Sequence, residues 1–224
     1  MALAGEGSTG SLRPYDIVLK AHKFQIKKAE LLMKMTKSYD NKHFVCPWQA
    51  GPILTSSIRK LAHNPERILS PYIREGMTAM DIGCGMGFFT LPMSGMVGKN
   101  GKVIAVDLQP EMLEGLKKNA VKSGADNITP HQCAQNSLRI EQWKGTVDFV
   151  SVFYMLHEVP DPERLISELR TVMSSKGKLL FVEPVVHVSA ATFQNSLKMI
   201  TASGFIAAET PKINFSRAVL FSVG

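Results

Sequence analysis

Short β-forming apolar segments alternate with helix-forming segments from about residue 77 to the end, and this alternation most limits the fold. The expected strands are 77–81, 102–107, 128–132, 147–153, 178–182, 205–208 and 218–223. The expected helices are 88–97, 110–123, 162–173 and 189–203. Strands that alternate with helices form βαβ units around a parallel sheet. The last two strands are joined by a short linker without a helix, so we expect them to pair antiparallel.

The N-terminal part differs in composition from this α/β region. Residues 1–12 are rich in Gly, Ser and Ala and lack the basic and apolar regions of a secretory signal, so we expect a flexible leader. Residues 13–72 are expected to form a helical lid. Of the net charge of +7, residues 13–44 carry +5, from eight basic and three acidic side chains. This basic helix is either a solvated face, a lid, or a peripheral contact with anionic lipid.

A glycine-rich loop follows the first expected strand. Gly83, Gly85 and Gly87 form a GxGxG pattern, and Phe88 stands where a dinucleotide-binding fingerprint needs its last glycine. Asp107 ends the second strand, 20 residues after Gly87. An acidic residue near that interval binds ribose hydroxyls in nucleotide-binding folds. The alternative interpretation of Asp107 is a polar cap on a strand end.

Four segments carry a family resemblance: MDIGCGMGFFT, VIAVDLQPEML, VDFVSVFYMLHEVPDPERLISELRTVM and SSKGKLLFVEP. They span about residues 77–184 and resemble the class I S-adenosylmethionine (SAM)-dependent methyltransferases, in particular the small-molecule branch with the ubiquinone and menaquinone methyltransferases. The resemblance implies an α/β, Rossmann-like three-layer sandwich. It has a mostly parallel seven-stranded sheet with an antiparallel closing pair, and residues 73–224 form the SAM-binding domain. SAM is then the cofactor and S-adenosylhomocysteine the product.

The resemblance also implies a set of cofactor contacts. Asp81 and the loop would hold the methionine end of SAM, the loop comprising Gly83, Cys84, Gly85, Met86 and Gly87. Asp107 would bind the ribose, Leu108 would lie against the adenine, and Phe153 would border the sulfonium. The acidic residue usual after the third strand is absent, and the side-chain carbonyl of Gln135 or Asn136 can replace it.

Three residues beyond the fourth and fifth strands are the catalytic candidates. His157 titrates near neutral pH and is a candidate base, or else a loop histidine that orders the backbone. Glu183 can orient the acceptor or bind backbone amides. Tyr154 can offer its hydroxyl or cover the methyl donor. Methyl transfer needs a base only if the nucleophile must lose a proton.

The composition bears on the remaining function classes. Three irregularly spaced cysteines fit a cytoplasmic protein without disulfides, and we expect no structural metal. The positive charge allows a nucleic-acid methyltransferase, but the base-binding motifs of those enzymes are missing after the fourth strand, so we expect no tight nucleic-acid binding. A non-catalytic SAM-binding protein is the other alternative. The expected acceptor is a small or lipid-like molecule; the oligomeric state is not predicted.

Overall fold

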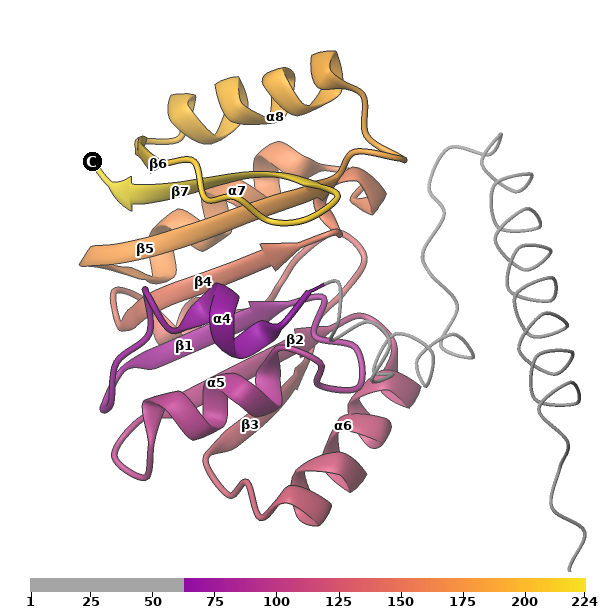
Figure 1. Cartoon of the computed structure of the whole chain (residues 1–224), viewed down its shortest axis with the longest axis vertical. Coiled ribbons are helices and arrows are strands. Elements are labelled where there is room, and N and C mark those ends of the chain that lie inside the picture. Colours follow the sequence, from indigo (N-terminus) through magenta and orange to yellow (C-terminus); the bar gives the residue numbers. More distant parts are fainter. Residues whose placement is uncertain (1–62) are drawn as a thin grey trace, which may run out of the picture. The chain divides into compact units, whose positions relative to one another are not determined.

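A computed structural model of the chain describes residues 63–224. The predictions for the leader, for the basic helix, and for lid residues up to 62 therefore lie outside the described residues. The described part is an α/β domain built on one sheet (Figure 1).

The sheet has seven strands in the order β3-β2-β1-β4-β5-β7-β6. Their bounds are β1 (Thr78–Ile82), β2 (Lys102–Asp107), β3 (Ile128–Gln132), β4 (Val147–Phe153), β5 (Met173–Pro184), β6 (Phe205–Glu209) and β7 (Ser216–Val223). Strands β1 to β5 pair in parallel, whereas β7 pairs antiparallel with both β5 and β6. The predicted Rossmann-like sheet with its antiparallel closing pair is confirmed.

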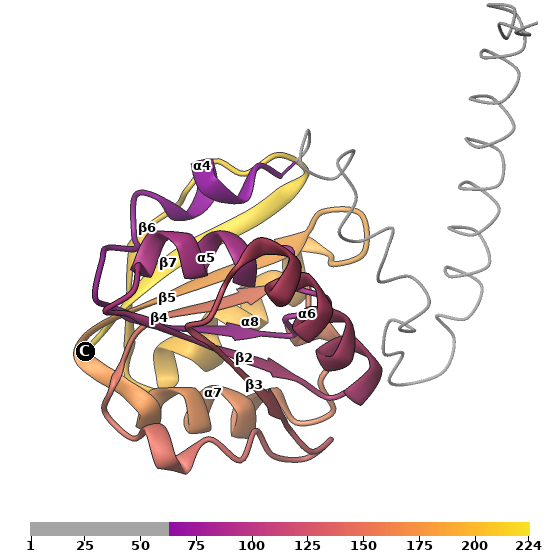
Figure 2. The same cartoon turned by 90° about the horizontal axis from the view of Figure 1, so that it is seen from below.

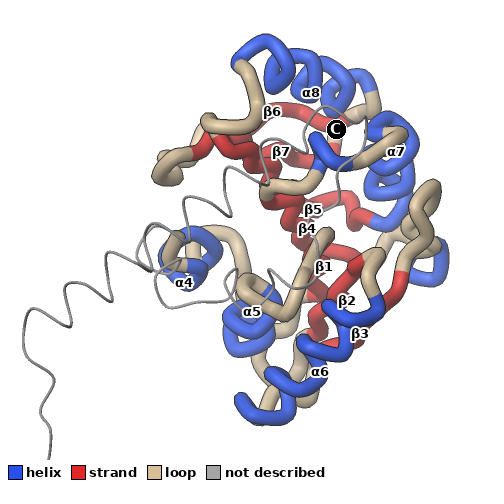
Figure 3. Tube along the Cα trace, turned by 90° about the vertical axis from the view of Figure 1, so that its right-hand side faces the viewer, coloured by secondary structure: helices blue, strands red, loops and turns tan. Residues whose placement is uncertain are grey.

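Helices cover both faces of this sheet and complete three layers. One face carries α4 (Pro65–Leu69), α5 (Thr90–Val97) and α6 (Pro110–Ser123), and the other carries α7 (Pro162–Val172) and α8 (Ala190–Ala202) (Figures 2 and 3). Two short 3-10 turns, η3 (Glu141–Trp143) and η4 (Leu156–Glu158), flank β4. Helices on both faces bury the inner parallel strands, which accounts for the mostly apolar sequences of β2 and β4, whereas the edge strand β3 is only half-buried.

The strands divide their side chains between apolar clusters on the two faces of the sheet. Along β2, Val103 packs beneath α5 with Phe149 and Leu180. Its neighbour Ile104 points to the opposite core, which contains the apolar faces of α7 and α8. This alternation follows from the two-residue period of a strand, along which successive side chains point to opposite faces of the sheet.

Local sequence signals explain where most helices begin. The side chain of Asp161 accepts a hydrogen bond of 3.0 Å from the backbone N–H of Arg164, with Pro162 at the first helical position of α7. Helix α6 likewise begins at Pro110 and ends at Gly124, whose φ of 67° is left-handed. These signals lie within a few residues of each helix end, so the sequence alone predicts where these helices begin and end.

Several boundaries differ from the predicted ones, and for two of them the structure gives a local reason. Strand β5 begins at Met173, not near Lys178, because Met173 already pairs with Val147 on β4. The register between β4 and β5 then shifts, because the next paired residues are Phe149 and Lys178. Residues 174–177 of β5 therefore form an irregular part of the strand. Helix α5 begins at Thr90, not Phe88, because the glycine loop continues through five turn residues, 85–89. Pro92 then falls in the first turn, where proline is tolerated.

Candidate active site

The order of the strands locates the candidate site. From β1 the chain proceeds to β2 on one side of the sheet, and later to β4 on the other. Ligands of such sheets bind at this switch point, beyond the carboxyl ends of the strands. The glycine loop follows β1, Asp107 ends β2, Tyr154 and His157 follow β4, and Glu183 lies at the end of β5. The fold thus collects most of the predicted site residues at one edge.

The glycine loop adopts a backbone that other residues rarely take. Gly83, Gly85 and Gly87 have φ values of 70°, 54° and 98°. A Cβ on Gly87 would lie 2.6 Å from Cδ1 of Leu116, and one on Gly83 would lie 3.2 Å from Cβ of Met155. A Cβ on Gly85 would meet nothing nearer than the sulfur of Met112, at 4.0 Å. Glycine therefore lets the loop pack tightly against Met155 and Leu116, and at Gly85 it leaves space for a ligand to approach the backbone.

The two residues between the glycines hold the loop to its neighbours. The backbone N–H groups of Gly83 and Cys84 both donate to the carbonyl of Val106 at the end of β2. Burial raises the pKa of the Cys84 thiol well above its usual value, so this thiol stays neutral at pH 7. The carbonyl of Met86 accepts a 2.9 Å hydrogen bond from the side chain of Asn119 on α6.

Asp107 joins the glycine loop to β2. One carboxylate oxygen accepts from the backbone N–H of Gly85 at 2.8 Å, and the other accepts from that of Gln109 at 3.0 Å. Burial raises the pKa of Asp107, although these backbone hydrogen bonds favour the ionised form. A carboxylate has about four acceptor sites, so Asp107 keeps capacity to accept from ligand hydroxyls.

Asp81 lies deeper and supports the loop from below. It is 3% exposed, and its carboxylate accepts a 2.7 Å hydrogen bond from the hydroxyl of Thr90, the first residue of α5. This contact holds the start of α5 against the end of β1. A direct contact between Asp81 and the methionine end of SAM stays a prediction.

The predicted adenine-side residues surround the end of β3. Leu108 is half-buried, and its carbonyl accepts from the side chain of Gln132 at 3.4 Å. Gln135 and Asn136 are exposed at the tip of a tight turn closed by a bridge between Ala134 and Ser137. The turn begins beside Asp107, because the N–H of Cys133 donates to the Asp107 carbonyl. The backbone contact of Cys133 therefore joins this turn to the predicted ribose-binding residue, although the two are far apart in sequence.

Phe153 and Tyr154 form an aromatic cluster at the end of β4. The ring of Phe153 is buried, with its centroid 4.4 Å from that of Phe89 and 4.5 Å from that of Tyr154. Tyr154 has a φ of 61°, which is uncommon for a residue other than glycine. Its hydroxyl lies 2.9 Å from Nε2 of His63 and also contacts the hydroxyl of Ser216. The hydroxyl predicted to be catalytic is thus part of a packed polar network.

His157 and Glu183 form a close pair beyond β4 and β5. One carboxylate oxygen of Glu183 lies 2.6 Å from Nδ1 of His157, and the other accepts from the His157 backbone N–H at 3.2 Å. Glu183 is 1% exposed. Burial disfavours the charged imidazole, but the hydrogen bond and charge of Glu183 outweigh it and raise the pKa of His157. His157 lies in η4 after β4 and Glu183 lies on β5, and Glu183 orients the ring as well as binding a backbone amide.

The raised pKa of His157 has a consequence for stability. Its folded-state value lies above the unfolded one of about 6.5. The pair therefore stabilises the fold fully only below the unfolded value, and this contribution is lost as the pH rises through the folded-state pKa.

Several residues that hold the site were not predicted from the sequence. They are His63, Thr90, Asn119 and Ser216. His63 is buried, and its Nε2 lies 2.9 Å from the carbonyl of Asn214 as well as near Tyr154. It is separated from Asn214 by 151 residues in the chain, so no local sequence pattern predicts the contact.

An accessible glycine backbone at a switch point, beside a buried carboxylate, is typical of a nucleotide-like cofactor site.

Comparison with known proteins identifies the family. The family model described as a methyltransferase domain matches residues 73–213. The chain belongs to the class I SAM-dependent methyltransferases, as its motifs had indicated.

Individual relatives agree with this assignment over part of their length. A demethylmenaquinone methyltransferase of Lactococcus lactis is 32% identical over 108 residues, which are 48% of this chain and 42% of the relative. One from Bacillus cereus is 24% identical over 160 residues, which are 69% of this chain and 60% of the relative. The chain thus matches less than two thirds of the length of these relatives.

A solved structure of a SAM-dependent methyltransferase from Aquifex aeolicus has the same fold. It superposes with a TM-score of 0.73 at 24% identity and covers 80% of this chain and 100% of that one. Among the residues that the structure describes, no helix is both long and apolar enough to cross a membrane.

Proposed function

We propose that this protein transfers the methyl group of SAM to a small or lipid-like acceptor whose reacting atom carries an acidic proton. The observation that carries this proposal is the His157–Glu183 pair at the carboxyl edge of the sheet that also bears the glycine loop. The matched demethylmenaquinone methyltransferases support the lipid-like class of acceptor.

The residues at the edge fit SAM. The open backbone at Gly85 admits close approach of the methionine end, and the carboxylate of Asp107 can accept from the ribose hydroxyls. Leu108 would contact the adenine, and Gln135 or Asn136 would accept from its amine. Bound SAM supplies an electrophilic methyl group on a sulfonium, with Phe153 at its border.

His157 would act on the acceptor. Glu183 accepts a hydrogen bond from the N–H at Nδ1, which leaves the lone pair of Nε2 to remove a proton from the acceptor. Glu183 then stabilises the imidazolium that forms. Tyr154 shapes this end of the site through its contacts with His63 and Ser216. The lid predicted for residues 13–72, which would exclude water from the acceptor, and a cytoplasmic location are parts of the same proposal.

The proposal is tested by incubating the purified full chain with methyl-labelled SAM and two acceptor series. One series consists of quinols and phenols with short and long alkyl chains, and the other consists of RNA and DNA. We expect label in the quinol or phenol series. Label only in nucleic acid, or in neither series, would contradict the proposed acceptor class.

The pH dependence of turnover gives a separate prediction. His157 must be neutral to act as a base, and its pKa is raised in the folded protein. We therefore expect turnover to increase with pH through an apparent pKa above about 6.5 and then to level off. Initial rates at saturating SAM across this range measure it. A rate that is independent of pH there would exclude His157 as the base.

A further inference from the structure

Two loops at the carboxyl edge expose apolar side chains. The loop from β5 to α8 carries Val185 and Val186, which are 41% and 77% exposed, and the loop from β6 to β7 carries Phe215, which is 69% exposed. The loops are joined, because the backbone N–H of Val185 donates to the carbonyl of Phe215 at 3.0 Å. We call residues 185–187 and 212–215 the rim surface.

The charges of the rim surface have one sign. Neither residues 184–189 nor residues 210–217 include Asp or Glu, whereas Lys212 and His187 are exposed. Arg217 follows at the start of β7 and donates to the carbonyl of Val188. The acid that precedes the second loop, Glu209, accepts a 3.4 Å hydrogen bond from the hydroxyl of Tyr72. The two loops therefore combine exposed apolar side chains with the cation Lys212 and contain no acidic residue, whereas the lowered pKa of His187 leaves its ring neutral at pH 7.

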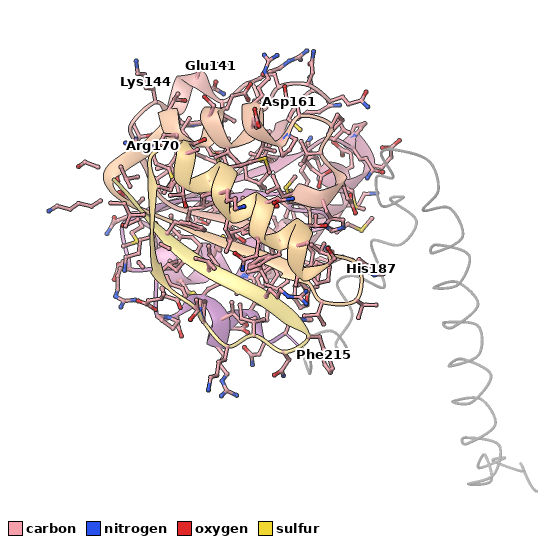
Figure 4. The ribbon with its side chains drawn as sticks, turned by 90° about the horizontal axis from the view of Figure 1, so that it is seen from above. Glu141, Lys144, Asp161, Arg170, His187 and Phe215 are labelled. Atoms are coloured by element: carbon pink, nitrogen blue, oxygen red, sulfur yellow. The ribbon has the colours of Figure 1, made fainter. Side chains whose placement is uncertain are left out.

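The rim surface borders the candidate active site. Residue 185 comes two positions after Glu183, the partner of His157. The other loop ends at Asn214 and Ser216, which bind the His63–Tyr154 network. His187 and Phe215 lie on the same side of the domain (Figure 4). Burial, and secondly the charge of His157, lower the pKa of His187, which agrees with the closeness of the two histidines.

We propose that the rim surface is a contact with anionic lipid, which sets the mouth of the acceptor site against a membrane surface. Exposed aromatic and aliphatic tips enter the boundary between headgroups and acyl chains, while nearby cations meet anionic headgroups. A second copy of the chain fits less well, because a two-fold contact between identical surfaces brings their cations together. The link to acceptor delivery rests on the proposed function, whereas lipid binding does not.

The test measures binding of the full chain to vesicles of phosphatidylcholine with about 30 mol % phosphatidylglycerol, by sedimentation. It is run at roughly 0.15 M and 0.5 M salt, because higher salt would screen any attraction between the basic residues 13–44 and the vesicles. The variant is Val186→Ser with Phe215→Ser. The matched control is Val121→Ser on α6, which removes an apolar side chain that is 82% exposed outside the rim surface.

We expect the double variant to lose at least about tenfold in vesicle affinity at both salt concentrations, with the control unchanged. Calorimetry with S-adenosylhomocysteine checks that both variants remain folded. Equal vesicle binding by the double variant and the control would overturn the proposal. So would a dimer, seen by analytical ultracentrifugation, that the double variant abolishes without affecting vesicle binding. The assay uses no acceptor, so failure of methyl transfer leaves its result intact.

Discussion

Replacing His157 with alanine is expected to lower the turnover number about 100- to 10,000-fold, the usual contribution of a positioned base. Glu183 holds Nδ1 at 2.6 Å and binds the neighbouring backbone amide, so the ring is fixed before the acceptor enters. The variant loses the group that accepts the proton but keeps the glycine loop and Asp107. The expected result is therefore a large fall in turnover with little change in SAM affinity, measured by initial rates and calorimetry.

Glu183→Gln separates the roles of the two residues. It keeps the size of the side chain but removes the charge that raises the pKa of His157, so the rise of turnover with pH should move to lower pH. Glu163→Gln, at the exposed start of α7, is the matched control. If His157→Ala turns over at the wild-type rate, the base has been misassigned.

Replacing Asp107 with alanine is expected to weaken SAM binding by about 1.5–3 kcal/mol, the loss of a hydrogen bond to a charged group. This corresponds to roughly 10- to 150-fold in the dissociation constant. The effect has two sources, because Asp107 would bind the ribose and also anchors the backbone N–H of Gly85 at 2.8 Å. Isothermal titration measures it.

Two further variants make the Asp107 result specific. Asp126→Ala removes an exposed carboxylate between α6 and β3 and should bind SAM like the wild type. Asn136→Ala should cost less than Asp107→Ala, because Asn136 lies at an exposed turn tip. If Asp107→Ala binds SAM normally, the ribose site lies elsewhere.

The geometry of the proposed cofactor half of the site was predictable because its signals are local. Glycine at 83, 85 and 87 is required by left-handed backbone angles within a single loop. Asp107 follows from a strand that ends at a fixed distance along the chain. Parallel strands place their carboxyl ends at one edge, so the order of strands alone brings Asp107 to the loop.

The acceptor half was predictable only in part. His157 and Glu183 were identified because each follows a strand, but their 2.6 Å contact depends on how β4 and β5 pair. The network of Tyr154 depends on His63, 91 residues away in the chain. A contact of that length is set by tertiary packing and has no local signal in the sequence, and a catalytic role of the Tyr154 hydroxyl stays a prediction.

The most direct test of the central claim is isothermal titration of the purified full chain with SAM and with S-adenosylhomocysteine. The structure places an open glycine backbone beside the buried carboxylate of Asp107, so we expect each ligand to bind with a one-to-one stoichiometry and to stabilise the protein against heat. No heat of binding and no thermal stabilisation at millimolar ligand concentration would contradict the assignment of this edge as a SAM site.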